Sequence, residues 1–145
     1  MKNLKSLKTF TASLFIAGAF ASVQTAAAQC DTTVTYAERY MSDQFVPDGQ
    51  TYRALIYDDQ IAEFYTTFYG GSVYRIIGFS GLEKEQLIFS LYDQEDNLLY
   101  TNEEFRNAPY WDFEFKSTVS GRIEARLDPM KQTSGCAVLL IGFER

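Results

Sequence analysis

Over most of the chain, apolar and polar residues alternate with a period of two, which is typical of half-buried β-strands. The clearest segment places Trp111, Phe113 and Phe115 on one side of a strand, with Trp111 expected in the core, and charged residues on the other side. The last segment is apolar at nearly every position, which predicts burial on both faces. The predicted strands are Tyr52–Tyr57, Ile61–Tyr69, Val73–Phe79, Gln86–Tyr92, Leu98–Thr101, Tyr110–Lys116, Arg122–Leu127 and Cys136–Phe143.

Short strands at intervals of roughly ten residues, joined by Gly, Pro and Asp/Asn turns, predict an all-β domain. We expect an antiparallel, jelly-roll-like β-sandwich of about seven or eight strands, with a closed barrel as the alternative. Gly70-Gly71 separates the second and third strands and predicts a hairpin between them.

One segment ahead of the strands has a different period. Over Thr33–Phe45 the apolar residues recur every three or four positions, which predicts a short amphipathic helix. Asp31 or Thr32 would cap its start, and Pro47-Asp48-Gly49 would close it with a turn.

The N-terminus has the three parts of a bacterial secretion signal. Three lysines and no acidic residue precede the apolar run Phe10–Val23, and Ala26–Ala28 offers small residues for cleavage. The run is shorter than the roughly 20 residues that span a bilayer, and Gln29 and Ala27 do not fit the lipoprotein pattern. We therefore predict a cleaved signal peptide over 1–28, a single domain over 29–145, and a periplasmic or secreted protein without membrane insertion after cleavage.

The two cysteines lie near the two ends of the predicted mature chain. Cys30 follows the cleavage site, and Cys136 lies close to the C-terminus. Without a Cys-x-x-Cys motif or any histidine, a redox-active pair or thiol nucleophile is disfavoured. We predict a structural disulfide between them.

Composition excludes several classes of function. The net charge of −6, which becomes more negative once the signal lysines are removed, disfavours nucleic acid and anionic membrane as partners. Absence of histidine excludes Ser-His-Asp and Cys-His sites, and no phosphate-binding glycine motif occurs. We predict no cofactor and no catalysis. A carboxylate pair of the glycosidase type is the enzymatic alternative, with candidates Asp58, Asp59, Glu63, Asp112 and Glu114.

Four oxygen-bearing residues lie within five positions of each other. They offer the ligand chemistry that calcium prefers, but a hairpin turn at this position also uses Asp and Asn, and the plain turn is favoured. These residues are Asp93, Glu95, Asp96 and Asn97.

The remaining surface signal is aromatic. If the first three strands adjoin, their outward positions form one tyrosine-rich face, suited to binding because tyrosine and arginine combine large area with polar groups. An ordinary solvated strand face is the alternative. The predicted face comprises Arg53, Tyr57, Glu63, Tyr65, Tyr69 and Arg75.

Segments of the second half resemble bacterial pre-peptidase C-terminal domains. Ile61–Phe68 followed by Gly70–Ile76 is similar to their opening hairpin, Leu87–Asp93 running into Asn97–Leu99 to their central strand and turn, and Ser120–Arg126 to a later strand. The resemblance implies a β-sandwich accessory module without activity of its own. The prediction is therefore a binding module for a glycan or protein partner; a glycan-active enzyme and a structural envelope-associated protein are the alternatives.

Overall fold

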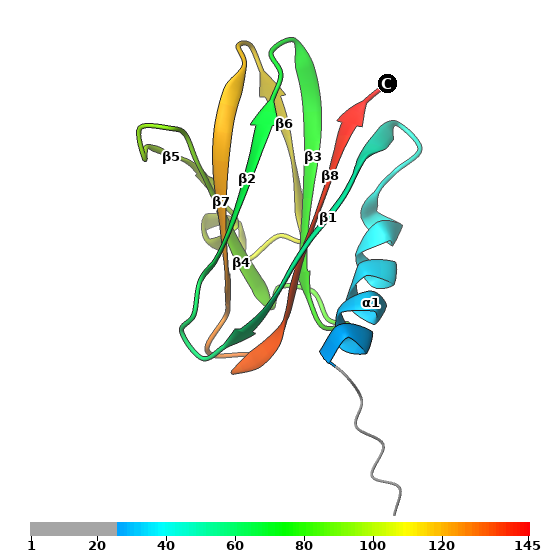
Figure 1. Ribbon diagram of the computed structural model, residues 1–145, viewed down its shortest axis with the longest axis vertical. Coiled ribbons are helices and arrows are strands. Elements are labelled where there is room, and N and C mark those ends of the chain that lie inside the picture. The colour runs from blue at the N-terminus through cyan, green and yellow to red at the C-terminus, as the bar shows by residue number, and fades with distance from the viewer. Residues whose placement is uncertain (1–25) are drawn as a thin grey trace, which may run out of the picture.

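The computed structural model describes residues 26–145, which form two packed antiparallel sheets with one helix against them (Figure 1). The helix α1 (Ala26–Ala37) leads into a 3-10 turn, Glu38–Tyr40, and a second 3-10 turn, η2, covers Asn102–Phe105. The strands are β1 (Phe45–Tyr57), β2 (Ala62–Phe68), β3 (Ser72–Ser80), β4 (Leu87–Tyr92), β5 (Leu98–Thr101), β6 (Tyr110–Phe115), β7 (Val119–Leu127) and β8 (Ser134–Glu144).

The strand order is that of a jelly roll. One sheet has the order β1-β8-β3-β6 and the other β2-β7-β4-β5. The pairs β1–β8, β2–β7, β3–β6 and β4–β5 are those of one long hairpin wrapped into two sheets. The predicted all-β sandwich is confirmed, and the two separate sheets exclude the closed barrel for the described residues.

Side chains that point inward from both sheets form the main core. Phe68 of β2 stacks on Phe115 of β6 with ring centroids 4.6 Å apart, and Phe89 and Leu139 are fully buried between the sheets. Trp111 lies at the margin of this core: it is half-buried and contacts the rings of Tyr100 and Phe105. Its predicted side of the strand is correct, although it is less buried than expected.

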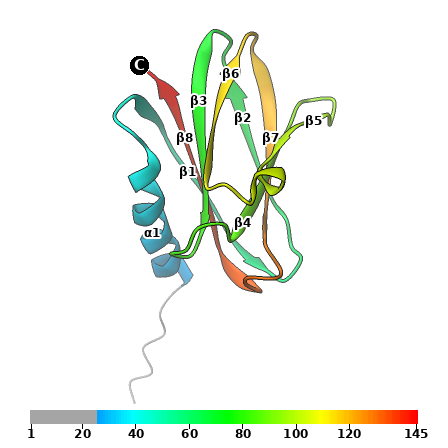
Figure 2. The same ribbon diagram turned by 180° about the vertical axis from the view of Figure 1, so that it is seen from behind.

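The helix α1 covers the outer face of the β1-β8-β3-β6 sheet (Figure 2). Val34 and Ala37 of α1 pack against Phe79 and Val138 in a second apolar cluster. This cover explains why β8 is apolar on both faces, because one face meets the core and the other meets the helix.

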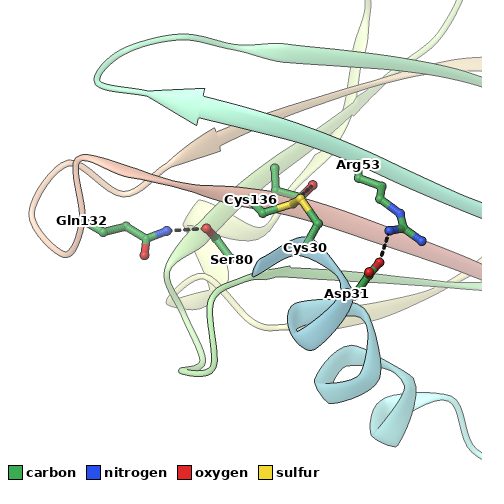
Figure 3. Close-up of a disulfide and its surroundings, with 7 residues drawn as sticks. Cys30, Asp31, Arg53, Ser80, Gln132 and Cys136 are labelled. Carbon is green, nitrogen blue, oxygen red and sulfur yellow. Dashed lines mark hydrogen bonds and ion pairs between the residues drawn. A yellow bond between two sulfur atoms is a disulfide. The ribbon is translucent and has the colours of Figure 1, made fainter. Parts of the chain in front are cut away.

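A disulfide joins Cys30 of α1 to Cys136 of β8, as predicted, with the two Cα atoms 5.3 Å apart. In the same region Asp31 forms an ion pair with Arg53 of β1, and Gln132 donates a hydrogen bond to the buried Ser80 (Figure 3). The helix is therefore held by a covalent bond, an ion pair and apolar packing.

The predicted helix Thr33–Phe45 is wrong in both bounds. The helix α1 begins at Ala26, the first described residue, and the helical segment ends at Tyr40, where Met41 takes an extended conformation. The predicted Pro47-Asp48-Gly49 turn is a bulge inside β1, where the pairing with β8 shifts between Pro47 and Thr51. The apolar residues that predicted the helix are at least partly buried, but Phe45 is buried from strand β1 and not from the helix.

The predicted hairpin of the second and third strands is also wrong. β2 pairs with β7, whereas β3 pairs with β6 and β8, so Gly70-Gly71 connects the two sheets. A Cβ on Gly70 would lie 2.7 Å from the Ser117 Cα, and Gly71 has φ +83°. These glycines are required by close approach and backbone conformation at the crossing.

Residues 1–25 of the predicted signal peptide lie outside the described residues. Within 26–145, no helix has the length and apolar character that a membrane span requires.

Candidate functional site

The outer face of the β2-β7-β4-β5 sheet has no α-helix over it in the described part of the chain; only the short turn η2 lies against it, where Glu103 pairs with Arg126 (Figure 1). Alternation along each strand decides which side chains it presents, and the register aligns them in rows, with Tyr65 opposite Arg122 and Arg122 opposite Tyr92. We call this surface the open face; its residues are Glu63, Tyr65, Thr67, Ser90, Tyr92, Ser120, Arg122, Glu124 and Arg126.

Arg122 lies at the centre of the open face. Its guanidinium forms ion pairs with Glu124, with Asp96 at 2.8 Å and with Glu63 at 3.5 Å. It also lies over the ring of Tyr92, 4.5 Å from the centroid. The hydrogen bonds to Glu124 and then Asp96 raise the pKa of Arg122 above its ordinary value. Arg122 is thus a fixed cation surrounded by carboxylates, with only 18% of its side chain exposed.

Tyr65 is the most prominent aromatic group of the open face, with 66% of the residue exposed. Its hydroxyl donates a hydrogen bond of 2.7 Å to Glu63, which raises the pKa of Tyr65 above its ordinary value. Because Glu63 also contacts Arg122, the exposed ring is oriented by the same network that fixes the arginine.

An open groove of about 510 Å³ runs beside Tyr65. It lies between the end of β2, the start of β7 and the turn after β4, and a smaller hollow of about 270 Å³ continues it along that turn. The groove is lined by Tyr65, Thr66, Thr67, Asp93, Gln94, Asp96, Ser120, Gly121 and Arg122. Hydroxyl, carboxylate and amide groups around one exposed ring suit recognition by hydrogen bonds and ring contact.

The four candidate calcium ligands form the turn that borders this groove. One Asp93 oxygen accepts from the backbone N–H groups of Glu95 and Asn97, and the other accepts from the Asn97 amide. The Asn97 hydrogen bonds lower the pKa of Asp93 below its ordinary value. Asp96 is paired with Arg122, and no group of three or more metal-binding side chains occurs in 26–145. This arrangement supports the plain turn interpretation.

The single tyrosine-rich face predicted from the sequence is not formed. Glu63 and Tyr65 lie on the open face, and Tyr69 follows β2 where the chain leaves that sheet. Arg53 and Tyr57 lie on β1, in the other sheet. The prediction required β1, β2 and β3 to adjoin, whereas β2 belongs to the opposite sheet from the other two.

Arg75, the sixth predicted residue, is largely buried by contacts within the protein. It makes two hydrogen bonds with Asp112, of 2.7 and 2.8 Å, and donates one to the Tyr40 carbonyl. Its guanidinium lies 4.4 Å from the ring centroids of both Phe45 and Tyr110. These contacts occupy the side chain and give it a structural role beside α1.

The carboxylates of the enzymatic alternative are spread over the molecule. Asp58 and Asp59 lie in the exposed turn between β1 and β2, and Glu63 lies on the open face. Asp112 is paired with Arg75 on the other sheet, and Glu114 is exposed on the same strand. The five carboxylates are thus divided among the turn after β1, the open face and β6; Asp112 and Glu114 share one face of β6, where Asp112 is already paired with Arg75.

Sequence reasoning missed Arg122 and Tyr92, which complete the site with Tyr65. The signal for Arg122 was present, because Ile123 and Ala125 face inward and so place Arg122 and Glu124 outward. The pairing of β7 with β2 and β4, which brings Arg122 next to Tyr65 and Tyr92, could not be inferred from the sequence.

Comparison with known proteins gives a likeness of fold. No protein-family model matches the sequence, and no curated protein is found as a relative. Among solved structures, the fold is similar to PliG of Aeromonas hydrophila, a periplasmic lysozyme inhibitor of g-type lysozyme. The TM-score is 0.51 at 6% identity, over 66% of this chain and 85% of PliG. At this identity the likeness concerns the fold, and the resemblance to pre-peptidase C-terminal domains stays a prediction.

Proposed function

We propose that this is an exported, non-catalytic protein that binds a protein partner through the open face. The observation that carries the proposal is the exposed Tyr65 ring beside the groove, held there by the Glu63–Arg122 network. Exposed aromatic rings on a rigid sheet lose little conformational entropy on binding, which makes them effective contact residues. On the opposite sheet, α1 covers the outer side of β3 and β8, which leaves less of that face available.

Charge and compartment support the same function. The acidic net charge and the carboxylates around Arg122 favour a partner with a basic surface. The Cys30–Cys136 disulfide is typical of an oxidising compartment, in agreement with a periplasmic or secreted protein. Because PliG has a similar fold and is a lysozyme inhibitor, a g-type lysozyme is the first partner to test.

Tyr65→Ala should weaken binding of the partner by about tenfold or more, because it removes the most prominent exposed ring of the open face. It should change the free energy of unfolding by less than about 1 kcal/mol, since the ring is mostly in solvent. Calorimetric titration and inhibition of a g-type lysozyme would measure the first effect. Affinity capture from the periplasm, with titration of any captured protein, and a panel of soluble glycans extend the test to other partners.

Tyr57→Ala is the matched control, because Tyr57 is 52% exposed on the opposite sheet. It should leave the affinity unchanged. Equal losses in the two variants, or no loss with Tyr65→Ala, would contradict the open face as the binding surface. Binding only to a glycan would replace the protein partner in the proposal.

The exported form should begin at Gln29 and contain no free thiol. The reason is the predicted cleavage after Ala28, which leaves Cys30 in the mature chain to pair with Cys136. Intact mass of protein isolated from the periplasm or medium, with and without reduction, measures both. A retained N-terminus or a lipid mass on the cysteine would contradict the predicted processing.

A further inference from the structure

The sandwich is open between its sheets where β1 begins and β2 ends. The two strands lie on the same side of the molecule, but β1 diverges from β2 towards this end (Figure 1). The bulge between Pro47 and Thr51, with Gly49 at φ +83°, lies at this point of β1. Residues of both sheets line an open pocket at this place.

The resulting intersheet pocket has a volume of about 510 Å³. Within its lining, Ile141 and Tyr74 are buried, whereas Gln50 and Tyr69 are exposed. The lining residues are Asp48, Gln50, Thr66, Thr67, Tyr69, Ser72, Tyr74, Ile141 and Phe143.

Asp48 is the one charged residue in this lining. It is half-buried, its carboxylate accepts a 2.8 Å hydrogen bond from the Gln50 N–H, and it interacts with the Tyr52 hydroxyl. Burial raises the pKa of Asp48 above its ordinary value, since a desolvated carboxylate is less stable as an anion. None of the ion pairs within 26–145 involves Asp48. The pocket therefore contains a partly desolvated negative charge without a cation beside it.

Aromatic rings line the rest of the pocket. Tyr74 is 7% exposed and Phe143, whose ring centroid is 6.5 Å from that of Tyr74, is 39% exposed. Tyr69 at the rim is 64% exposed. Aromatic faces attract cations and pack against aliphatic stems, and a planar guanidinium also stacks on them.

We infer that the intersheet pocket binds an arginine side chain of the protein partner, with its guanidinium at Asp48 and its stem against Tyr74 and Phe143. A carboxylate matches the two-pronged donor geometry of arginine, and the aromatic lining matches its flat head and long stem. The inference rests on the proposed function for the source of the arginine. Thr66 and Thr67 line both this pocket and the groove of the open face, so one partner can reach both sites across β2.

A small arginine compound tests the pocket independently of any partner. Nα-acetyl-L-arginine methylamide, titrated into the ¹⁵N-labelled protein, should produce saturable amide shifts at Gln50 and Ser72. The citrulline analogue has the same shape without the charge and should bind about tenfold more weakly or worse. Equal binding of the two compounds, or no shifts with either, would overturn the inference.

Asp48→Asn should weaken binding of the arginine compound by about tenfold or more, and the variant should remain folded. The amide oxygen can still accept from the Gln50 N–H, and the neutral group costs less to bury. Asp59→Asn is the matched control: it removes the same charge from the exposed turn at the other end of β1 and should leave the affinity unchanged. Unchanged affinity in Asp48→Asn, or an equal loss in Asp59→Asn, would overturn the inference.

Two further variants complete the test. Gln50→Glu adds a second carboxylate at the rim and should tighten binding of the arginine compound several-fold; no tightening would count against the site. Tyr65→Ala should leave this binding unchanged, because Tyr65 does not line the pocket. The two proposals are therefore tested separately. Binding of the arginine compound tests only the intersheet pocket. The effect of Tyr65→Ala on binding of the partner tests only the open face.

Discussion

Replacing Cys30 and Cys136 together with alanine should lower the free energy of unfolding by about 4–5 kcal/mol. The disulfide closes a loop with a sequence separation of 106, and in the chain-entropy model so long a loop strongly restricts the unfolded chain. The loss is large relative to the roughly 5–15 kcal/mol of a typical domain. Urea unfolding of the oxidised protein and the double variant, followed by fluorescence and circular dichroism, would measure it.

Arg53→Gln provides the comparison, because it removes the ion pair with Asp31 and leaves the disulfide intact. Both side chains are substantially exposed, so this variant should lose no more than about 1 kcal/mol. A loss below about 1 kcal/mol in the double cysteine variant would mean that packing and the ion pair hold α1 without the disulfide. The strand content should remain in both variants, since the main core lies between the sheets.

The attachment of α1 bears directly on the choice of binding surface. Val138 and Leu140 of β8 are buried because the helix lies over them, and Cys30 sits in the same cluster. The helix thereby covers the part of one outer face that β3 and β8 form. The other sheet keeps its polar outer face, on which Tyr65 and Arg122 are placed.

The strands could be predicted because their signal is local. Alternation in Tyr110–Phe115 reports which side chains face the core, whatever strand lies beside it. Burial of both faces of β8 could be predicted for the same reason, because a continuously apolar strand has to be packed against other elements on each of its faces. The disulfide is the one long-range contact that could be predicted, because the chain has only two cysteines and they lie near its two predicted mature ends.

Strand partners and sheet membership could not be predicted in this way. Gly70-Gly71 is compatible both with a hairpin and with a crossing between sheets, and the decisive contact is the approach of Gly70 to Ser117, far along the chain. That choice separated Tyr65 from Arg53 and Arg75 and thus divided the predicted face. It also brought Arg122 to Tyr65, a neighbour that no local pattern indicates.

The end of the helix was missed for a different reason. Tyr40 and Met41 continue the apolar spacing, and both pack against the cluster beneath α1. Spacing predicts burial well, but here the backbone becomes extended at Met41 and Phe45 is buried from β1 instead. The pattern was therefore correct about the side chains and wrong about the conformation.

Asn102→Ala should destabilise the protein by about 3 kcal/mol or more, since several buried backbone groups lose their partner at once. Asn102 is fully buried at the start of η2, where the chain leaves β5 and crosses towards β6 (Figure 2). Its side-chain oxygen accepts from the Phe89 N–H at 2.9 Å, and its amide donates to the carbonyls of Leu87 and Ala108 at 3.0 Å each. One side chain thus fastens the crossing to β4.

Asn102→Asp separates this hydrogen-bond role from simple packing, because it keeps the shape but replaces the donor with a second acceptor. A carboxylate facing two carbonyl oxygens should cost at least as much as alanine at neutral pH. Burial would raise the pKa of the new acid in the folded state, so stability relative to the wild type should recover as the pH falls. Asn97→Ala, in the exposed turn after β4, should cost less than about 1 kcal/mol. Urea unfolding of the three variants at neutral and acidic pH measures these differences, and an Asn102→Asp variant as stable as the wild type at neutral pH would show that the three hydrogen bonds do not hold the crossing.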